Sequence, residues 1–233
     1  MHAWFSWSCG LDGLAAVPLP GDAQCTAARG PLAPGSGEAL PLSGPFALHP
    51  ALGALHALYA EQQLAVVHAT GLPYRERSHF DAQQVLESGG QRPHELTTGW
   101  LARALAATGR TGLAVQTAVP LVLRGSAEVD TWAPSVLPDP SSDLVARVER
   151  LYAHDTALAR ALVRARQLRD GGGMPERDAG MAGGGARAQA VLLARRAGEF
   201  LLRPGGPQVA VLELGGWDSH ANQAAPQGAL ANN

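Results

Sequence analysis

Apolar residues along this chain follow two patterns, a helical spacing of three to four residues and short continuous runs typical of buried strands. The helical spacing predicts helices over residues 50–59, 78–87, 99–108, 142–169 and 186–202. The continuous runs predict strands over residues 3–9, 64–68 and 208–214, and one or two strands within 113–123. Because helices alternate with short apolar strands, the pattern predicts an α/β fold with a mostly parallel, doubly wound sheet covered on both faces.

Loop composition separates these elements. Segments rich in Pro, Gly and Ser predict loops over 18–45 and 130–141, and the Gly-rich segment 171–185 predicts a flexible connection. A length of 233 residues suits a single domain, 1–233. Ligands of open parallel sheets bind beyond the carboxyl ends of the strands, so polar residues that follow a strand are the first candidates for a site.

Composition narrows the possible partners. Hydrophobic residues make up 46% and charged residues 16%, which predicts a globular protein. A net charge of -2 gives no reason to expect a nucleic-acid partner, and no apolar run approaches the roughly 20 residues needed for a membrane span. The first residues lack the features of a signal peptide, which predicts a cytoplasmic location for the sequence as written. Cys9 and Cys25 are either ordinary thiols or a pair formed in an oxidising compartment.

The strongest candidate site is the segment Gly215-Gly-Trp-Asp-Ser-His220, which follows the strand predicted over 208–214. Asp218 and His220 lie two residues apart, and a carboxylate oxygen and an imidazole nitrogen are both ligands of zinc-like ions. The glycines permit the close backbone approach that such a site needs. The alternative is a polar turn in which Asp218 caps the segment that follows.

A second candidate is the segment Arg75-Glu-Arg-Ser-His-Phe-Asp81. Ser78 stands at a predicted helix start, where backbone N–H groups and the helix dipole attract anions. This position suits a nucleophile or an oxyanion contact, with Arg75, Arg77 and His79 binding the anion. The alternative, which the sequence alone favours, is that Ser78 is an N-cap, Asp81 completes a capping box and His79 is exposed.

A third candidate is Asp12, which follows the strand predicted over 3–9. A carboxylate at the end of a strand can hold a metal, but Asp12-Gly13 is also an ordinary turn pair, and the sequence alone favours the turn. His68 lies inside an apolar run and is predicted to be a core residue rather than a ligand. The other histidines show no partner in the sequence.

Several segments occur in an order that resembles a known bacterial family. The two most specific are Ser78-His-Phe-Asp-Ala-Gln83 and Gly215-Gly-Trp-Asp-Ser-His220. Further matching segments lie at 46–52, 64–68, 73–77, 87–89, 99–105 and 123–126. Together they resemble the bacterial domain-of-unknown-function family fifteen-oh-one of the alkaline phosphatase/sulfatase-like superfamily, over nearly the whole chain from Gly10 onward.

The resemblance implies an alkaline phosphatase-like α/β fold and metal-assisted hydrolysis of a small anionic phosphate or sulfate ester. It implies a divalent metal, zinc- or calcium-like, held by Asp12, Asp218 and His220, and no nucleotide cofactor. It places Ser78 as the nucleophile or anion contact at a helix start. It also implies export, commonly through a twin-arginine signal.

The chain departs from the family pattern at both ends. Trp7-Ser-Cys-Gly10 replaces an Arg-Gly-Gly-like turn, and no export signal precedes it. Relatives continue past Asn222 through Ser-Glu-Phe-Gly-Arg-like and Asp-His-Gly-like motifs that are absent here. We therefore expect an incomplete domain with at most three metal ligands and little or no turnover. The alternatives are a non-catalytic binding or structural protein that retains the fold, and a gene fragment without a function of its own.

Overall fold

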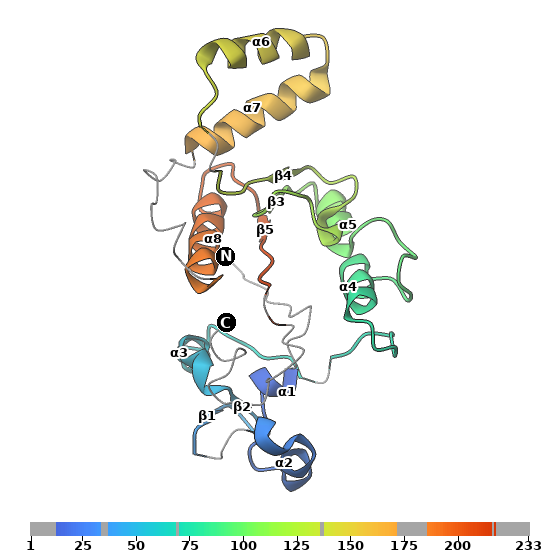
Figure 1. Cartoon of the computed structure of the whole chain (residues 1–233), viewed down its shortest axis with the longest axis vertical. Helices are drawn as coiled ribbons and strands as arrows, with labels where there is room; N and C mark the ends of the chain where they lie inside the picture. Colours follow the sequence, from blue (N-terminus) through green and yellow to red (C-terminus); the bar gives the residue numbers. More distant parts are fainter. Residues whose placement is uncertain are drawn as a thin grey trace. The chain divides into compact units, whose positions relative to one another are not determined.

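The structure, a computed structural model, describes residues 13–33, 37–68, 70–135, 138–171, 186–215 and Trp217. These residues form a mixed α/β fold, shown in Figure 1, and fall into two compact units. Of the described residues, the first unit holds those within 87–89 and 96–214, and the second holds those up to 86, those within 90–95, Gly215 and Trp217. The strand predicted over 3–9 and nearly all of the Gly-rich segment 171–185 lie outside the described residues.

A parallel sheet of three strands lies in the first unit. The strands are β3 (Gly112–Ala114), β4 (Val129–Thr131) and β5 (Val209–Val211), in the order β4-β3-β5. Leu113 is in register with Asp130 on one side and with Ala210 on the other. The predicted α/β fold with a parallel sheet is confirmed at this level, and the carboxyl ends of all three strands point the same way.

The described helices of this unit are α5 (Trp100–Thr108), the 3-10 helix η3 (Leu121–Leu123), α6 (Ser142–Tyr152), α7 (Thr156–Gly171) and α8 (Ala186–Leu201). The helices predicted over 99–108 and 186–202 are confirmed. Helix α5 ends at Gly109, whose φ of 61° is the left-handed conformation that glycine adopts without strain. None of the helices in the described part of the chain combines the length and the apolar character needed to cross a bilayer.

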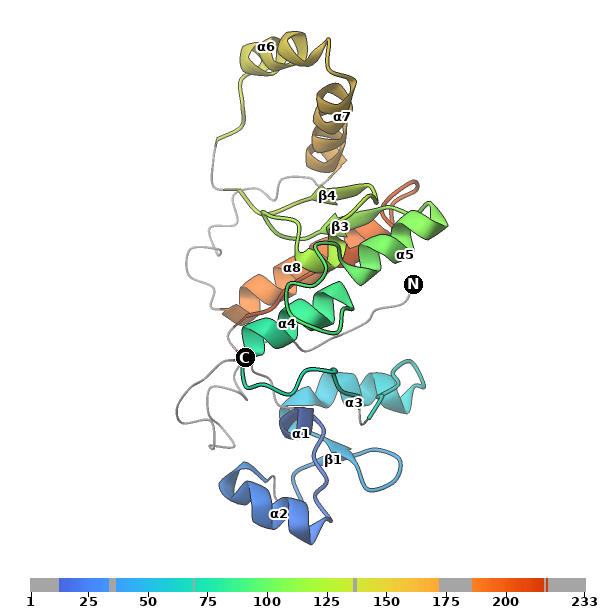
Figure 2. The same ribbon diagram turned by 90° about the vertical axis from the view of Figure 1, so that its right-hand side faces the viewer.

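Helices cover both faces of the sheet because alternate residues of β3 point to opposite sides. Leu113 packs with Phe200 of α8, and Ala114 packs with Leu105 of α5 and Leu123 of η3. These side chains are almost fully buried. Figures 1 and 2 show α8 and α5 on opposite sides of the strands. The two apolar layers fix the sheet and therefore the direction in which its carboxyl ends point.

The long helix predicted over 142–169 is wrong in one respect, because the chain forms two helices there. The break lies at residues 153–155, where Asp155 Oδ1 accepts hydrogen bonds from the backbone N–H groups of Ala157 (2.9 Å) and Leu158 (3.0 Å). A side chain that satisfies two free N–H groups stabilises a new helix start at this point. Apolar periodicity continues through the break, so it does not reveal it.

A strand also lies where the Pro-rich composition predicted a loop. The last two residues of strand β4, Asp130 and Thr131, lie within the predicted loop 130–141. Its residues Val-Asp-Thr include a charged side chain, Asp130, which forms an ion pair with Arg164 at 3.0 Å. Pairing with β3 in the sheet thus outweighs the local composition, since strand formation depends on cross-strand neighbours.

The second unit is built from short elements. They are α1 (Gly13–Ala16), α2 (Ala23–Arg29), the 3-10 helix η1 (Gly30–Leu32), the antiparallel strands β1 (Leu40–Pro41) and β2 (Ala47–Leu48), the 3-10 helix η2 (Pro50–Leu52) and α3 (Gly53–Ala60), followed by the first residues of α4 (His79–Ser88). Ala16, Val17 and Leu48 form its core. The helix predicted over 50–59 is confirmed as η2 and α3.

Two predictions for this unit are wrong. The segment 18–45 is not all loop, because Asp22 Oδ1 accepts a hydrogen bond from Cys25 N–H at 2.6 Å and caps α2. Residues 64–68 form no strand, although the half-buried Val66 packs against the core. His68 stacks on Phe46 with ring centroids 3.6 Å apart, so this apolar run is held by side-chain packing rather than by strand pairing.

Candidate functional site

Ser78 immediately precedes α4, and its hydroxyl binds the first turn of that helix. Its Oγ accepts a hydrogen bond from the backbone N–H of Asp81 at 3.3 Å, which satisfies one of the free donors at the helix start. The helix ends at Gly89, whose φ is 67°. The predicted helix and the predicted N-cap are both confirmed.

The carboxylate of Asp81 connects this helix start to two aromatic side chains. Asp81 Oδ2 accepts a hydrogen bond from the Tyr74 hydroxyl at 3.1 Å, and Oδ1 lies 3.9 Å from Nε2 of His94. Desolvation, followed by the hydrogen bond to Asp81 and its charge, raises the pKa of Tyr74, and hydrogen bonds with the Ser78 side chain and backbone oppose this rise. Tyr74 is therefore a neutral donor near pH 7, and Ser78, Tyr74, Asp81 and His94 form one polar cluster.

The loop that carries His94 is itself fixed by a carboxylate. Glu95 Oε2 accepts hydrogen bonds from the backbone N–H groups of Gln91 (2.7 Å) and Arg92 (3.1 Å). These two bonds lower the pKa of Glu95, because they favour its ionised form. His94 adopts a positive φ of 58°, a conformation that few non-glycine residues take, and the tight turn around Glu95 holds it there.

The Asp81 carboxylate lies at the helix start where an anion was predicted to bind. Arg75 and Arg77 are exposed, and His79 is half-buried with its ring tilted against Phe80 at 4.1 Å between centroids. The prediction that His79 would be exposed is therefore inaccurate. The carboxylate of Asp81 already places a negative charge in the first turn of α4, where the helix dipole favours it. A bound anion would have to share this helix start with that charge.

Sequence reasoning did not identify Tyr74 and His94 as members of this cluster. Tyr74 lies seven residues before Asp81, and His94 lies beyond the glycines that end the helix, so no periodic signal joins them. The pairing arises because the loop after α4 returns to the helix start. A tyrosine just before a capped helix and a histidine after its terminating glycines were the only available hints.

The three predicted metal ligands, Asp12, Asp218 and His220, lie outside the described residues, so their mutual geometry stays a prediction. The described chain does include the strand that precedes two of them, Asp218 and His220, in the sequence. Strand β5 runs parallel to β3, and Val115 N–H donates to the Val211 carbonyl at 2.8 Å at the carboxyl end of this pair. In the sequence, residues 212–215 follow this strand and precede Asp218.

Within the described ranges, no group of three or more His, Cys, Asp or Glu side chains is arranged to hold a metal ion. Cys25 is a free thiol.

Comparisons of the chain with models of protein families, with curated proteins and with solved structures gave no match. Any statement about chemistry therefore depends on the residues themselves.

A pair of substitutions separates the two roles considered for Ser78. Ser78→Ala removes the cap and should lower the free energy of unfolding by about 1 kcal/mol. Ser78→Asn removes the hydroxyl but retains a good cap, so its stability should stay close to that of the wild type. Urea unfolding followed by circular dichroism measures both. Equal stability losses in the two variants would contradict the capping role.

Proposed function

We propose that this chain has an alkaline phosphatase/sulfatase-like fold and that its chemistry is metal-assisted hydrolysis of a small phosphate or sulfate ester. One observation supports this proposal above the others. The Gly-Gly-Trp-Asp-Ser-His segment follows a strand of a parallel sheet, beyond the carboxyl end where open α/β sheets bind their ligands. The resemblance of the segment order to the family named above gives the class of reaction.

The proposed metal ligands are Asp12, Asp218 and His220. Carboxylate oxygens and imidazole nitrogens both bind zinc, and catalytic zinc sites use three protein ligands with a fourth position open for water or substrate. The separation of Asp218 and His220 by one residue, after two glycines, allows both side chains to turn toward the same point. When bound, the metal would stabilise negative charge on the ester and lower the pKa of the attacking oxygen.

The remaining roles belong to α4 and the segment before it. Ser78 would face the oxyanion from the helix start, with Arg75 and Arg77 supplying positive charge. We propose that turnover is low. The Ser78 Oγ already accepts the Asp81 N–H, and its neighbour Tyr74 is a neutral phenol that cannot take a proton from it. Neither of these two contacts activates the hydroxyl as a nucleophile.

The hydrogen bond between Ser78 Oγ and the Asp81 N–H favours a second function, that of a non-catalytic binding or structural protein with this fold. In that case Ser78 is only a cap, and the Tyr74–Asp81–His94 cluster only holds the loop after α4. The two functions differ in one property that can be measured directly, which is whether Asp218 and His220 bind a metal.

The test is the metal content of the purified full chain after equilibration with zinc and dialysis. We expect about one equivalent in the wild type and a large loss in Asp218→Ala and in His220→Ala, because each variant lacks one of three protein ligands. Asp143→Ala is the matched control, since Asp143 is an exposed aspartate on α6 that makes only a 4.0 Å contact with Arg147. Mass spectrometry of the metal gives the readout.

Equal metal content in wild type and Asp218→Ala would refute the ligand assignment and leave the non-catalytic function. Hydrolysis of p-nitrophenyl phosphate and p-nitrophenyl sulfate by the zinc-loaded chain tests the reaction separately. Activity that Ser78→Asn abolishes, with its stability intact, would assign the nucleophile to Ser78. Metal binding without hydrolysis would support the fold and the site but not the turnover.

A further inference from the structure

The hairpin of α6 and α7 has no core of its own. None of the described side chains in either helix is buried, and Leu151 is 75% exposed. Within the hairpin, Arg166 and Glu149 form an ion pair that joins α7 to α6. A helical pair without buried apolar residues gains little from the hydrophobic effect, so its position depends on what attaches it to the sheet.

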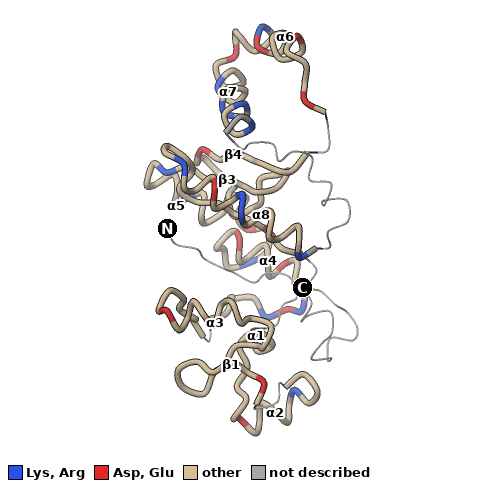
Figure 3. The backbone as a smooth tube through the Cα atoms, turned by 90° about the vertical axis from the view of Figure 1, so that its left-hand side faces the viewer, with Lys and Arg blue, Asp and Glu red and all other residues tan. Residues whose placement is uncertain are grey.

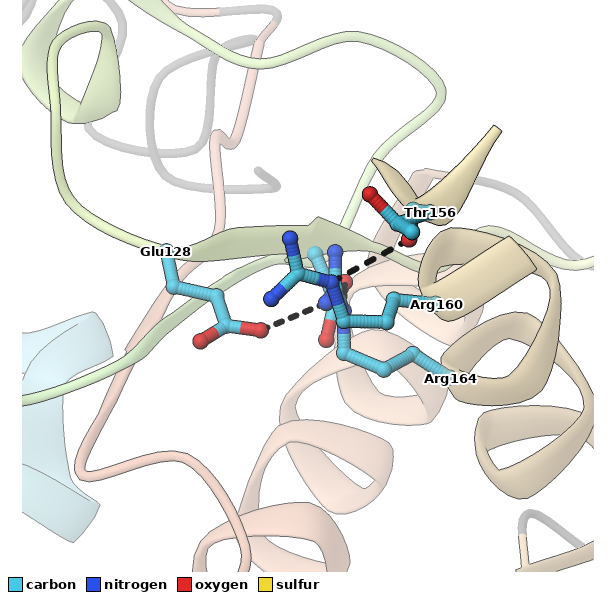
Figure 4. Close-up of polar contacts among 5 residues, drawn as sticks. Glu128, Thr156, Arg160 and Arg164 are labelled. Carbon is cyan, nitrogen blue, oxygen red and sulfur yellow. Dashed lines mark hydrogen bonds and ion pairs between the residues drawn. The ribbon is translucent and has the colours of Figure 1, made fainter. Parts of the chain in front are cut away.

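An arginine of α7 makes that attachment. Arg164 Nε donates to Asp130 Oδ1 at 3.0 Å, and its Nη1 lies 2.6 Å from Glu128 Oε1. Figure 4 shows Arg164 of α7 and Glu128 joined by a dashed line. One guanidinium thus binds two carboxylates on and beside strand β4. The Arg164 side chain is 33% exposed and that of Asp130 is 30% exposed, so both groups are partly desolvated. Charge-assisted hydrogen bonds of this kind are stronger than neutral ones.

Helix α7 also makes an apolar contact with the core of this unit. Leu168, one turn further along α7, packs against the cluster formed by Leu113, Val115 and Phe200. Trp132, which directly follows β4, packs against the same cluster with its ring 5.6 Å from that of Phe200. Helix α7 therefore covers part of this cluster next to the carboxyl end of β4.

We propose that the α6–α7 hairpin is an arm latched to the sheet by Arg164, and that opening the latch moves α7 away from the Trp132–Phe200 cluster. Glu128 and Asp130 hold the arm closed through charge, and Leu168 adds apolar packing. Since the Debye length falls from about 10 Å at 0.1 M salt to about 3 Å at 1 M, high salt lowers the cost of separating these charges. The inference does not depend on the proposed hydrolase function.

The chain offers a matched control on the same helix. Arg160 lies one turn before Arg164, and its Nε donates to the Thr156 carbonyl of its own helix at 3.2 Å (Figure 4). Arginines recur along α7, as Figure 3 shows, so removing either one changes the charge of the helix equally. Only Arg164→Met removes the contact with β4. Arg160→Met leaves it in place.

Hydrogen–deuterium exchange of the full chain, read by mass spectrometry, tests the latch. We expect Arg164→Met to raise exchange in peptides from 142–171 and in those covering Trp132 by about tenfold, as for the loss of a charge-assisted hydrogen bond. Arg160→Met should match the wild type. Raising salt from 0.1 M to 1 M should increase exchange of the same peptides in the wild type and have little further effect in Arg164→Met.

A second variant approaches the latch from the sheet. The double variant Glu128→Gln with Asp130→Asn keeps the shape of both side chains and should show the same exchange as Arg164→Met. It therefore also tests the latch if Arg164→Met does not fold. Combining the three substitutions should add no further increase, because one interaction is removed only once. Equal exchange in Arg164→Met and Arg160→Met, or an increase in 142–171 without one at Trp132, would overturn the proposal.

Discussion

Phe200→Ala should lower the free energy of unfolding by about 3–5 kcal/mol, a large part of the stability of an ordinary domain. Phe200 is 1% exposed and fills the space between α8 and the sheet, where it contacts Leu113, Val115 and Trp132. Its removal leaves a cavity against a sheet whose position it fixes. The guanidinium of Arg203 also lies 4.4 Å from the centre of its ring, and that contact is lost as well.

Leu202→Ala is the control for this prediction. Leu202 lies two residues further along the chain and is 74% exposed, so its truncation should change stability by about 0.5 kcal/mol or less. Chemical denaturation of both variants, followed by circular dichroism, measures the difference. A loss below 1 kcal/mol in Phe200→Ala would contradict the packing of α8 on this face of the sheet.

Gly99→Ala should be almost as damaging, for a reason that lies in the backbone. A Cβ at position 99 would stand 2.1 Å from the carbonyl oxygen of Val122 and 2.2 Å from that of Leu121. These are main-chain atoms of η3, which cannot move without breaking the hydrogen bond from Gly99 N–H to the Arg124 carbonyl (2.8 Å). We expect a loss of about 3 kcal/mol, at the upper end of the usual cost of overpacking.

Gly198→Ala, in contrast to Gly99→Ala, should raise the stability of the protein. Gly198 lies inside α8, and a Cβ there would meet nothing within 4 Å. Alanine loses less backbone entropy than glycine on forming a helix, so this variant should gain about 0.5–1 kcal/mol. A thermal melt of both proteins is sufficient. Similar behaviour of the two variants would contradict the close approach of η3 to the start of α5.

The elements that the sequence predicted well are those whose signals are local and agree with each other. Helix α4 has a serine cap at its start and Gly89 at its end, and α8 has a long apolar stripe. Strand β5 is a short apolar run whose three residues are half-buried in the sheet. In each case propensity, periodicity and packing favour the same structure.

The elements that were missed depend on partners distant in the sequence. Strand β4 forms because β3 pairs with it and Arg164 neutralises its carboxylate, and neither partner is visible in the segment itself. The break between α6 and α7 depends on the capping side chain of Asp155. The apolar run 64–68 lacks strand pairing and packs by its side chains instead.

The contacts of the candidate site are also of these two kinds, local and long-range. The N-cap at Ser78 follows from local spacing and was predicted, whereas the contacts of Asp81 with Tyr74 and His94 require the loop that returns to the helix start. The hydrogen bond from Asp81 N–H thus favours the role of Ser78 as the N-cap of α4. The structure leaves the metal hypothesis dependent on the segment that follows β5.

The central claim is that Asp12, Asp218 and His220 bind one cation. X-ray absorption of the zinc-loaded chain measures the ligand shell directly, since an imidazole nitrogen at about 2.0–2.1 Å gives a pattern that carboxylate oxygens do not. We predict oxygen ligands with one imidazole in the wild type, and loss of the imidazole signal in His220→Ala. An unchanged imidazole signal in His220→Ala, or a shell without imidazole in the wild type, would contradict the account.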